Sequence, residues 1–177
     1  MWRRILGYGA LAGLIVGVPI FGTTVVTKGH VPEFGLALGY TIMLIALSAE
    51  FLAIKQYRDL ELGGVIGFWR ALGLGLGVSI VAGIFYVVAW EAAVAYAHLD
   101  FAAAYARATI AHAQARGVSG AALARLVAEM DQFKASYANP LYRFGMTFAE
   151  IFPVGVLVSL VSAGLLSQSR FLPARKW

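Results

Sequence analysis

Hydrophobic residues form four long stretches of the chain, over residues 5–26, 34–54, 71–95 and 144–167, and polar segments separate them. A helix that crosses a membrane needs about 20 mostly apolar residues. All four stretches meet that requirement. The pattern therefore predicts four membrane-spanning helices.

The segment between the third and fourth stretches, residues 98–139, is more polar and has a different pattern. Apolar residues recur there at helical spacing in two short runs. Asp100 and Ser119 are suited to begin helices, whereas Gly117 and Asn139-Pro140 are suited to end them. We expect two amphipathic helices joined at Gly117 as a helical hairpin, too small to form a domain with its own core.

Composition supports the membrane interpretation. The 177 residues are 60% hydrophobic and 13% charged, with a mean hydropathy of +0.77. Soluble domains are about 45–50% apolar and about 25% charged. The chain has no cysteine, which excludes a disulfide framework and a thiolate site. The predicted fold class is all-α: a single integral membrane domain, built as a four-helix bundle with an extracytoplasmic helical hairpin between spans three and four.

Basic residues in short loops mark the cytoplasmic side of a membrane protein. With the N-terminus inside, the cytoplasmic segments hold Arg3, Arg4, Lys55, Arg58, Arg70, Arg170, Arg175 and Lys176. The outer side then has Lys28 in a short loop, and its other basic residues are spread over the long hairpin, which counts for less. We expect both termini to be cytoplasmic. The first stretch is longer than the core of a signal peptide, so we expect it to be retained. The net charge of +5 lacks a basic stripe or motif, which disfavours nucleic-acid binding.

Small residues recur every four positions in two of the stretches. Gly9, Gly13 and Gly17 do so in the first, and Gly75, Ser79 and Gly83 in the third. Such ladders let helix backbones approach closely in lipid. We expect contacts within the bundle, with a homo-oligomer interface as the alternative.

Three of the apolar stretches each hold one glutamate: Glu50, Glu91 and Glu150. A carboxylate in hydrocarbon is costly, so these residues indicate a polar interior. The predicted topology places Glu50 in the cytoplasmic half. It places Glu91 and Glu150 in the outer half, where they could share a pocket near Arg143 and His98.

Each glutamate has a structural and a functional interpretation. Glu91 is either an interfacial residue or part of a site, and Glu50 is either a helix-end carboxylate paired with Lys55 or Arg58 or part of a site. Glu150 is harder to explain structurally. Pro153 removes a backbone donor close to it and frees a carbonyl, an arrangement that lipid tolerates only against protein or water. Glu150 is therefore the first candidate for a functional polar residue.

The connection after the second stretch contains Lys55 and Arg58, and Arg70 follows it. These residues either anchor the chain at the inner interface or recognise an anionic lipid head group. His30, His98 and His112 lack a metal-ligand spacing, and no HExxH or Gly-x-Ser-x-Gly motif occurs. We expect no metal, no cofactor and no catalytic residue.

Several short motifs carry a family resemblance. They are Gly39-Tyr40, Met43, Tyr57-Arg58-Asp59, Gly63-Gly64, Tyr86, Trp90-Glu91, Tyr137-Ala138-Asn139-Pro140 and residues 146–155 (MTFAEIFPVG). Through these the chain resembles bacterial membrane proteins grouped as domain of unknown function 4199. The resemblance implies a four-span bundle with an extracytoplasmic helical insert in a bacterial cytoplasmic membrane. It implies no activity, and no site residue is carried over from it.

The leading functional hypothesis is a non-enzymatic accessory or assembly component, with the hairpin as its outer docking surface. Membrane lipids and a membrane protein, or a second copy of the chain, are the expected partners. One alternative is a small transporter or channel subunit that uses the three glutamates. The other is a membrane-embedded enzyme acting on lipid, with paired carboxylates in acid–base roles.

Overall fold

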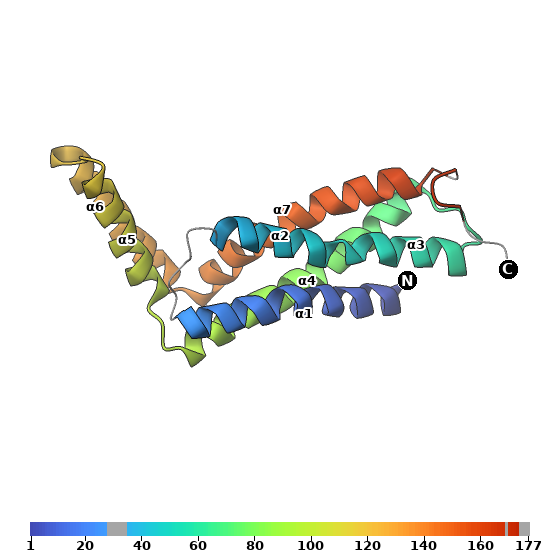
Figure 1. Cartoon of the computed structure of the whole chain (residues 1–177), viewed down its shortest axis with the longest axis horizontal. Coiled ribbons are helices and arrows are strands. Elements are labelled where there is room, and N and C mark those ends of the chain that lie inside the picture. Colours follow the sequence, from blue (N-terminus) through green and yellow to red (C-terminus); the bar gives the residue numbers. More distant parts are fainter. Residues whose placement is uncertain (28–34, 169, 174–177) are drawn as a thin grey trace.

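The computed structural model describes residues 1–27, 35–168 and 170–173, and every regular element within them is a helix (Figure 1). Phe34, the expected start of the second span, lies outside the described residues, as do Lys28, His30, Arg175 and Lys176. The helices are α1 (Trp2–Thr27), α2 (Gly35–Leu47), α3 (Ala49–Glu61), α4 (Phe68–Tyr96), α5 (Phe101–Ala115), α6 (Gly120–Tyr137) and α7 (Pro140–Leu166). The predicted all-α class is confirmed.

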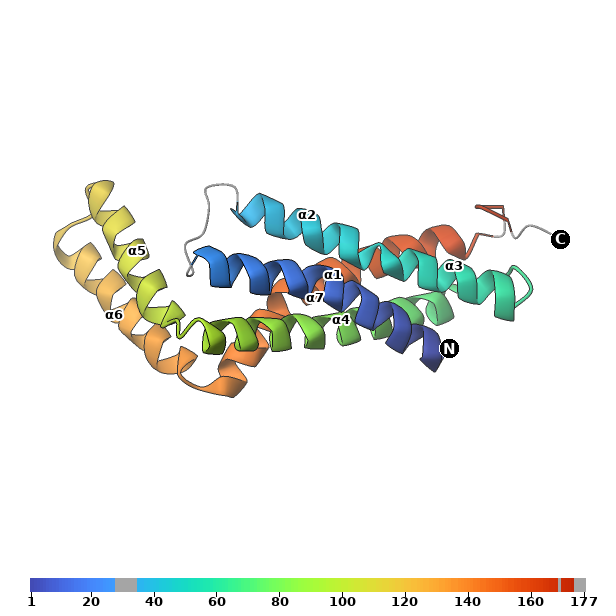
Figure 2. The ribbon, with the colours of Figure 1, turned by 60° about the horizontal axis from the view of Figure 1, so that its bottom comes forward.

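Four helical segments are long and apolar enough to cross a membrane: Trp2–Thr27, Ala37–Glu61, Phe68–Tyr96 and Pro140–Leu166. They lie side by side as a bundle, with the N-terminus and the end of α7 at one end (Figure 1, Figure 2). The hairpin of α5 and α6 projects from the opposite end. The chain is therefore a membrane protein with one helical projection.

Helix α4 is the centre of the bundle because α1 and α7 both pack against it. Gly9, Gly13 and Gly17 of α1 face α4, and a Cβ on Gly9 would lie only 2.5 Å from the Cβ of Val81. A Cβ on Gly13 would likewise collide with Phe85. The first ladder thus makes a contact within the bundle, as predicted, and is not available to a second copy of the chain.

The second ladder packs α4 against α7. A Cβ on Gly75 would lie 2.6 Å from the Oγ of Ser159, and a Cβ on Gly83 would lie 2.6 Å from the ring of Phe148. Burying apolar surface between helices gives no hydrophobic gain in lipid, so van der Waals contact between closely spaced backbones stabilises the pair instead. The first ladder thus packs α1 against α4, and the second packs α4 against α7.

The second span differs from its prediction in two ways. It is interrupted at Ser48, whose hydroxyl and backbone N–H both donate to the carbonyl of Leu44. It also continues to Glu61, so Lys55 and Arg58 lie on α3 rather than in a connection. The ion pair of Lys55 with Asp59, 2.5 Å long at i,i+4 spacing, supports these polar last turns. The apolar run ends earlier than the helix, which is why its end was predicted too early.

The hairpin consists of α5 and α6 as the apolar periodicity predicts. The Asp100 carboxylate accepts a hydrogen bond from the backbone N–H of Ala103, which confirms the first cap. Ser119 occupies the N-cap position of α6 as predicted, but its side chain makes no capping hydrogen bond. Asn139 caps α7 instead, by accepting from the N–H of Leu141.

Aromatic rings fix the hairpin to the bundle where α4 ends. Trp90 packs edge-on against Phe101, whose ring also lies 5.5 Å from that of Tyr137. The indole N–H of Trp90 donates to the Tyr137 hydroxyl at 2.9 Å. Burial raises the pKa of the Tyr137 phenol, which keeps it in its neutral, hydrogen-bonding form. The base of the hairpin is therefore anchored, while the rest extends from the bundle.

Candidate functional site

Glu50 is the most enclosed of the three glutamates. It lies on the first turn of α3 and its side chain has no exposed surface. Its two carboxyl oxygens accept hydrogen bonds from Ser79 of α4 at 2.5 Å and from Ser159 of α7 at 2.6 Å. Both serines are themselves buried. One carboxyl group thus joins three helices in the middle of the bundle.

Two glycines make the space for this arrangement. A Cβ on Gly155 would collide with the hydroxyl of Ser79 and would lie 3.5 Å from a carboxyl oxygen of Glu50. A Cβ on Gly75 would likewise collide with the hydroxyl of Ser159, so this glycine leaves room for that side chain. Among the described residues, no buried side-chain nitrogen or oxygen lacks a hydrogen-bond partner. The Glu50 cluster is therefore closed and satisfied, which is what a structural tie between helices requires.

The expected pairing of Glu50 with Lys55 or Arg58 is wrong. At 1.5 Å per residue, Arg58 lies about 12 Å further along the same helix. Lys55 instead pairs with Asp59. The glutamate faces the bundle interior, where the serines supply donors and no cation is needed to satisfy its hydrogen bonds.

Arg58 is also completely buried, so a lipid head group cannot reach it. Its guanidinium donates to the backbone carbonyls of Phe171 at 2.9 Å and of Leu172, and it pairs with Asp59 at 2.7 Å. A cation is favourable where a helix ends with free carbonyls. Arg58 holds the segment after α7 against α3, which corrects the lipid interpretation for this residue.

The other two proposed lipid contacts are also engaged. Lys55 is paired with Asp59, and Arg70 donates to the Tyr57 hydroxyl at 2.8 Å while lying over its ring. Lys55 and Arg58 therefore share Asp59, and Arg70 binds Tyr57, so the three residues do not converge on one head-group site.

Glu91 forms a two-pronged ion pair with Arg143 at the base of the hairpin. The Nε and Nη2 atoms of Arg143 donate to its two oxygens at 2.9 and 2.7 Å. A third nitrogen, Nη1, lies 3.4 Å from the backbone oxygen of Tyr137. Planar, bidentate pairs of this type fix geometry as well as charge. The pair links the end of α4 to the start of α7 and to the end of α6.

Glu150 is the exposed member of the three. Its carboxylate accepts one hydrogen bond, from the Tyr86 hydroxyl at 3.1 Å, and α7 continues as a helix through the nearby Pro153. Glu150 is exposed on the bundle, whereas Tyr86 is buried. A carboxylate has room for about four hydrogen bonds, so Glu150 has spare acceptor capacity. Glu91 and Glu150 have different partners, and no hydrogen bond or ion pair joins them in the described part of the chain.

Two partners in these contacts were not recognised from the sequence. Ser79 was assigned only to the packing ladder, and Ser159 was not singled out. A serine in an apolar span is a signal, but it does not say which residue it will meet. Among the described residues, no group of three His, Asp or Glu side chains could hold a metal ion.

The family comparison agrees with the resemblance seen in the motifs. A family model described as Protein of unknown function (DUF4199) matches residues 7–168. No curated protein and no solved structure matches the chain significantly.

Proposed function

The chain belongs to the DUF4199 family of proteins of unknown function, and from its own geometry we propose that it is a non-enzymatic accessory or assembly component of a membrane. The proposal rests on the difference between the bundle, where polar groups bind one another, and the hairpin, whose surface is mostly free. Glu50, Glu91 and Arg58 are used to hold helices of the bundle together. The hairpin, in contrast, projects away and leaves most of its surface free (Figure 1).

The hairpin has the features of a docking surface for another protein. On α5 the small side chains Ala104, Ala108, Ala111 and Ala115 are exposed and recur at helical spacing. Small residues allow a second helix to approach closely. Ordering the projecting part of the hairpin costs conformational entropy, while most of its surface stays uncovered. A partner that covers its outer surface accounts for its presence.

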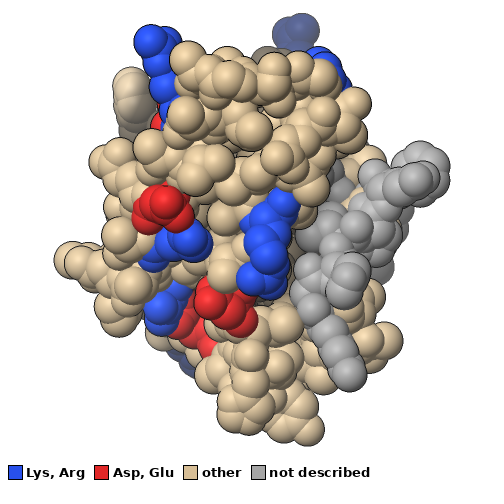
Figure 3. All heavy atoms as spheres, turned by 90° about the vertical axis from the view of Figure 1, so that its left-hand side faces the viewer, with Lys and Arg blue, Asp and Glu red and all other residues tan. Residues whose placement is uncertain are grey.

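Charge on the hairpin favours a protein partner over nucleic acid. Arg107, Arg116, Arg125 and Glu129 are all exposed, and Asp131 pairs with Lys134 at 2.7 Å. Figure 3 looks onto this end and shows basic and acidic side chains side by side. A mixed surface suits complementary charges on a folded protein, whereas nucleic-acid binding requires an extended basic stripe.

Photo-cross-linking in native membranes tests the proposal. A photoreactive residue at Ala108 is expected to capture a second protein, because that position lies on the free face of the hairpin. The matched control is the same residue at Leu14, which is exposed on α1 of the bundle and is expected to capture mainly lipid. A chain that is recovered as a lone monomer from the Ala108 position would contradict the proposal.

We place the hairpin on the extracytoplasmic side, because the opposite end carries Arg3, Arg4 and Arg170 in short segments. The chain has no cysteine, so a single introduced cysteine is the one thiol of the chain that a maleimide can label. With intact cells, a membrane-impermeant maleimide is expected to label Ala121→Cys on the hairpin and not Gln168→Cys after α7. Lysis is expected to expose Gln168→Cys. The reverse pattern would overturn this orientation.

Transport is the second candidate, and Glu150 is its supporting observation. An exposed carboxylate with one tyrosine donor has the capacity to take up a proton or a cation. Flux into proteoliposomes separates the two candidates, since transport requires Glu150→Gln to reduce a flux that an accessory component does not produce. The lipid-active enzyme has less support, because Arg143 already occupies both oxygens of Glu91.

A further inference from the structure

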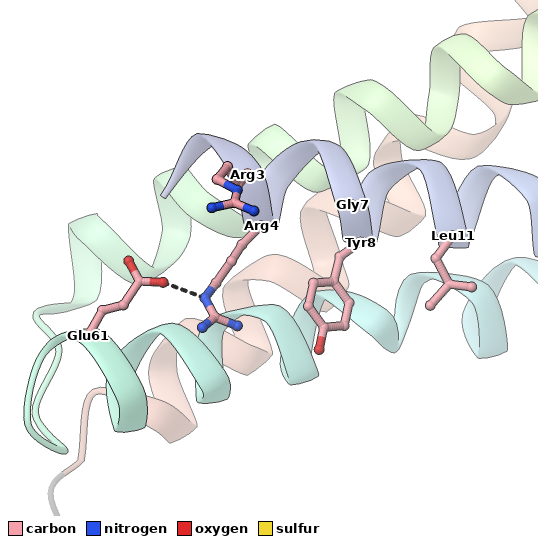
Figure 4. Close-up of a pocket in the computed structure, with 6 residues that line it drawn as sticks. All are labelled: Arg3, Arg4, Gly7, Tyr8, Leu11 and Glu61. Atoms are coloured by element: carbon pink, nitrogen blue, oxygen red, sulfur yellow. Dashed lines mark hydrogen bonds and ion pairs between the residues drawn. The ribbon is translucent and has the colours of Figure 1, made fainter.

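A groove of about 500 Å³ lies between the first turns of α1 and the end of α3 (Figure 4). Its lining consists of Arg3, Arg4, Gly7, Tyr8, Leu11 and Glu61. None of these residues belongs to the polar contacts between the helices described above. The groove is therefore a feature that the proposed function leaves unexplained.

The outer end of the groove is basic. Arg4 is held in place by two hydrogen bonds, from Nε to Glu61 at 2.6 Å and from Nη1 to Gln56 at 2.8 Å. Its Nη2 has no hydrogen-bond partner within the described part of the chain, and Arg3 is exposed on the same turns of α1 (Figure 4). Two guanidinium groups beside one carboxylate leave a net positive charge. Guanidinium groups are suited to phosphate oxygens.

The inner part of the groove is apolar and follows α1. A Cβ on Gly7 would meet nothing within 4 Å, so the helix surface is open there. Leu11 lies about 10 Å further into the bundle than Arg4, at 1.5 Å per residue, and is 49% exposed. Tyr8 extends from α1 toward α3 between these two levels (Figure 4). The groove thus has a charged end followed by an apolar channel along the membrane normal.

The depth of the groove matches the head-group region of a bilayer. Trp2 and Trp69 are both largely exposed at this end of the bundle, and indole rings prefer the membrane–water interface. Arg3 and Arg4 therefore lie at the level of lipid phosphates, and Leu11 lies at the level of acyl chains.

We propose that this groove binds an anionic phospholipid, with its phosphate on Arg3 and Arg4 and one acyl chain over Gly7 and Leu11. The order of charge and apolar surface along α1 reproduces the order of head group and tail in a lipid. The excess of basic over acidic side chains selects an anionic head group over a zwitterionic one. The site is distinct from Lys55, Arg58 and Arg70, which are engaged within the protein.

Native mass spectrometry of the full chain tests the proposal with phosphatidylglycerol and phosphatidylcholine as probes. The wild type is expected to retain phosphatidylglycerol with about tenfold preference. The double variant R3Q/R4Q is expected to lose that preference. The control R107Q/R125Q removes the same charge from the hairpin and is expected to keep it.

Two further variants separate loss of lipid binding from loss of the contact between α1 and α3. R3Q alone leaves the Arg4–Glu61 contact intact, so it lowers the preference without disturbing α1 and α3. Gly7→Leu fills the apolar channel without changing charge and is expected to reduce retention of both lipids. An unchanged preference in R3Q/R4Q would overturn the proposal. So would displacement of the lipid by glycerol phosphate at equal concentration, because that would show an anion site without a place for the tail.

Discussion

Glu50→Ala is expected to lower the free energy of unfolding by about 3 kcal/mol. Two terms contribute. A buried side chain is replaced by a cavity, which costs about 2–5 kcal/mol for large-to-small changes in well-packed cores. The hydrogen bonds to Ser79 and Ser159 are also lost, and in membranes each is worth only about 0.6–1.7 kcal/mol. Packing is thus the larger part of the loss. Reversible unfolding in bicelles measures the change.

The matched variant is Glu50→Gln. Glutamine has the shape of glutamate, and it can accept from one serine while donating to the hydroxyl of the other. It is expected to stay within about 1 kcal/mol of the wild type, which is the range of net hydrogen-bond contributions. Glu50→Gln as destabilising as Glu50→Ala would show that the bundle needs a charged carboxylate, against the structural account of this residue.

Gly13→Ala is expected to destabilise the contact between α1 and α4 by about 2 kcal/mol, in the range that overpacking costs in tight cores. The new Cβ would collide with the Cβ of Phe85, and the backbones of the two helices must separate to admit it. This loss outweighs the gain of up to about 1 kcal/mol that alanine gives over glycine within a helix. Steric trapping of the folded chain in bicelles gives the difference.

Gly22→Ala is the control on the same helix, because its Cβ would meet nothing within 4 Å. It is expected to be neutral or stabilising. If both substitutions changed stability equally, helix propensity rather than close packing would explain the glycines of α1, and the bundle would not depend on the Gly9–Gly13–Gly17 ladder.

The spans, the two glycine ladders and the hairpin were predictable because each depends on local pattern. Length and hydropathy are enough to find a spanning helix, and small residues every four positions are enough to find a close contact. The rotation of a helix without such a ladder, and the identity of the helix that meets each ladder, are not readable in this way. Helix α2 is apolar on all sides, so its sequence does not show which face meets a neighbour.

That missing rotation explains why the partners of Glu50 were not found. Ser79 and Ser159 are 29 and 109 residues away in the chain, and only the packed arrangement of α3, α4 and α7 brings them to the carboxyl group. The nearer charges, Lys55 and Arg58, looked more suitable in sequence. They point to Asp59 and to the segment after α7, since α3 continues past the apolar run.

We propose that the buried acids hold the helices of the bundle together and that the hairpin carries the function. Photo-cross-linking from Ala108 in native membranes tests it most directly when the wild type and Glu50→Gln are compared. The same adduct with a second protein, at the same yield, is expected in both backgrounds. A lone monomer in the wild type, or an adduct lost in a stably folded Glu50→Gln chain, would contradict it.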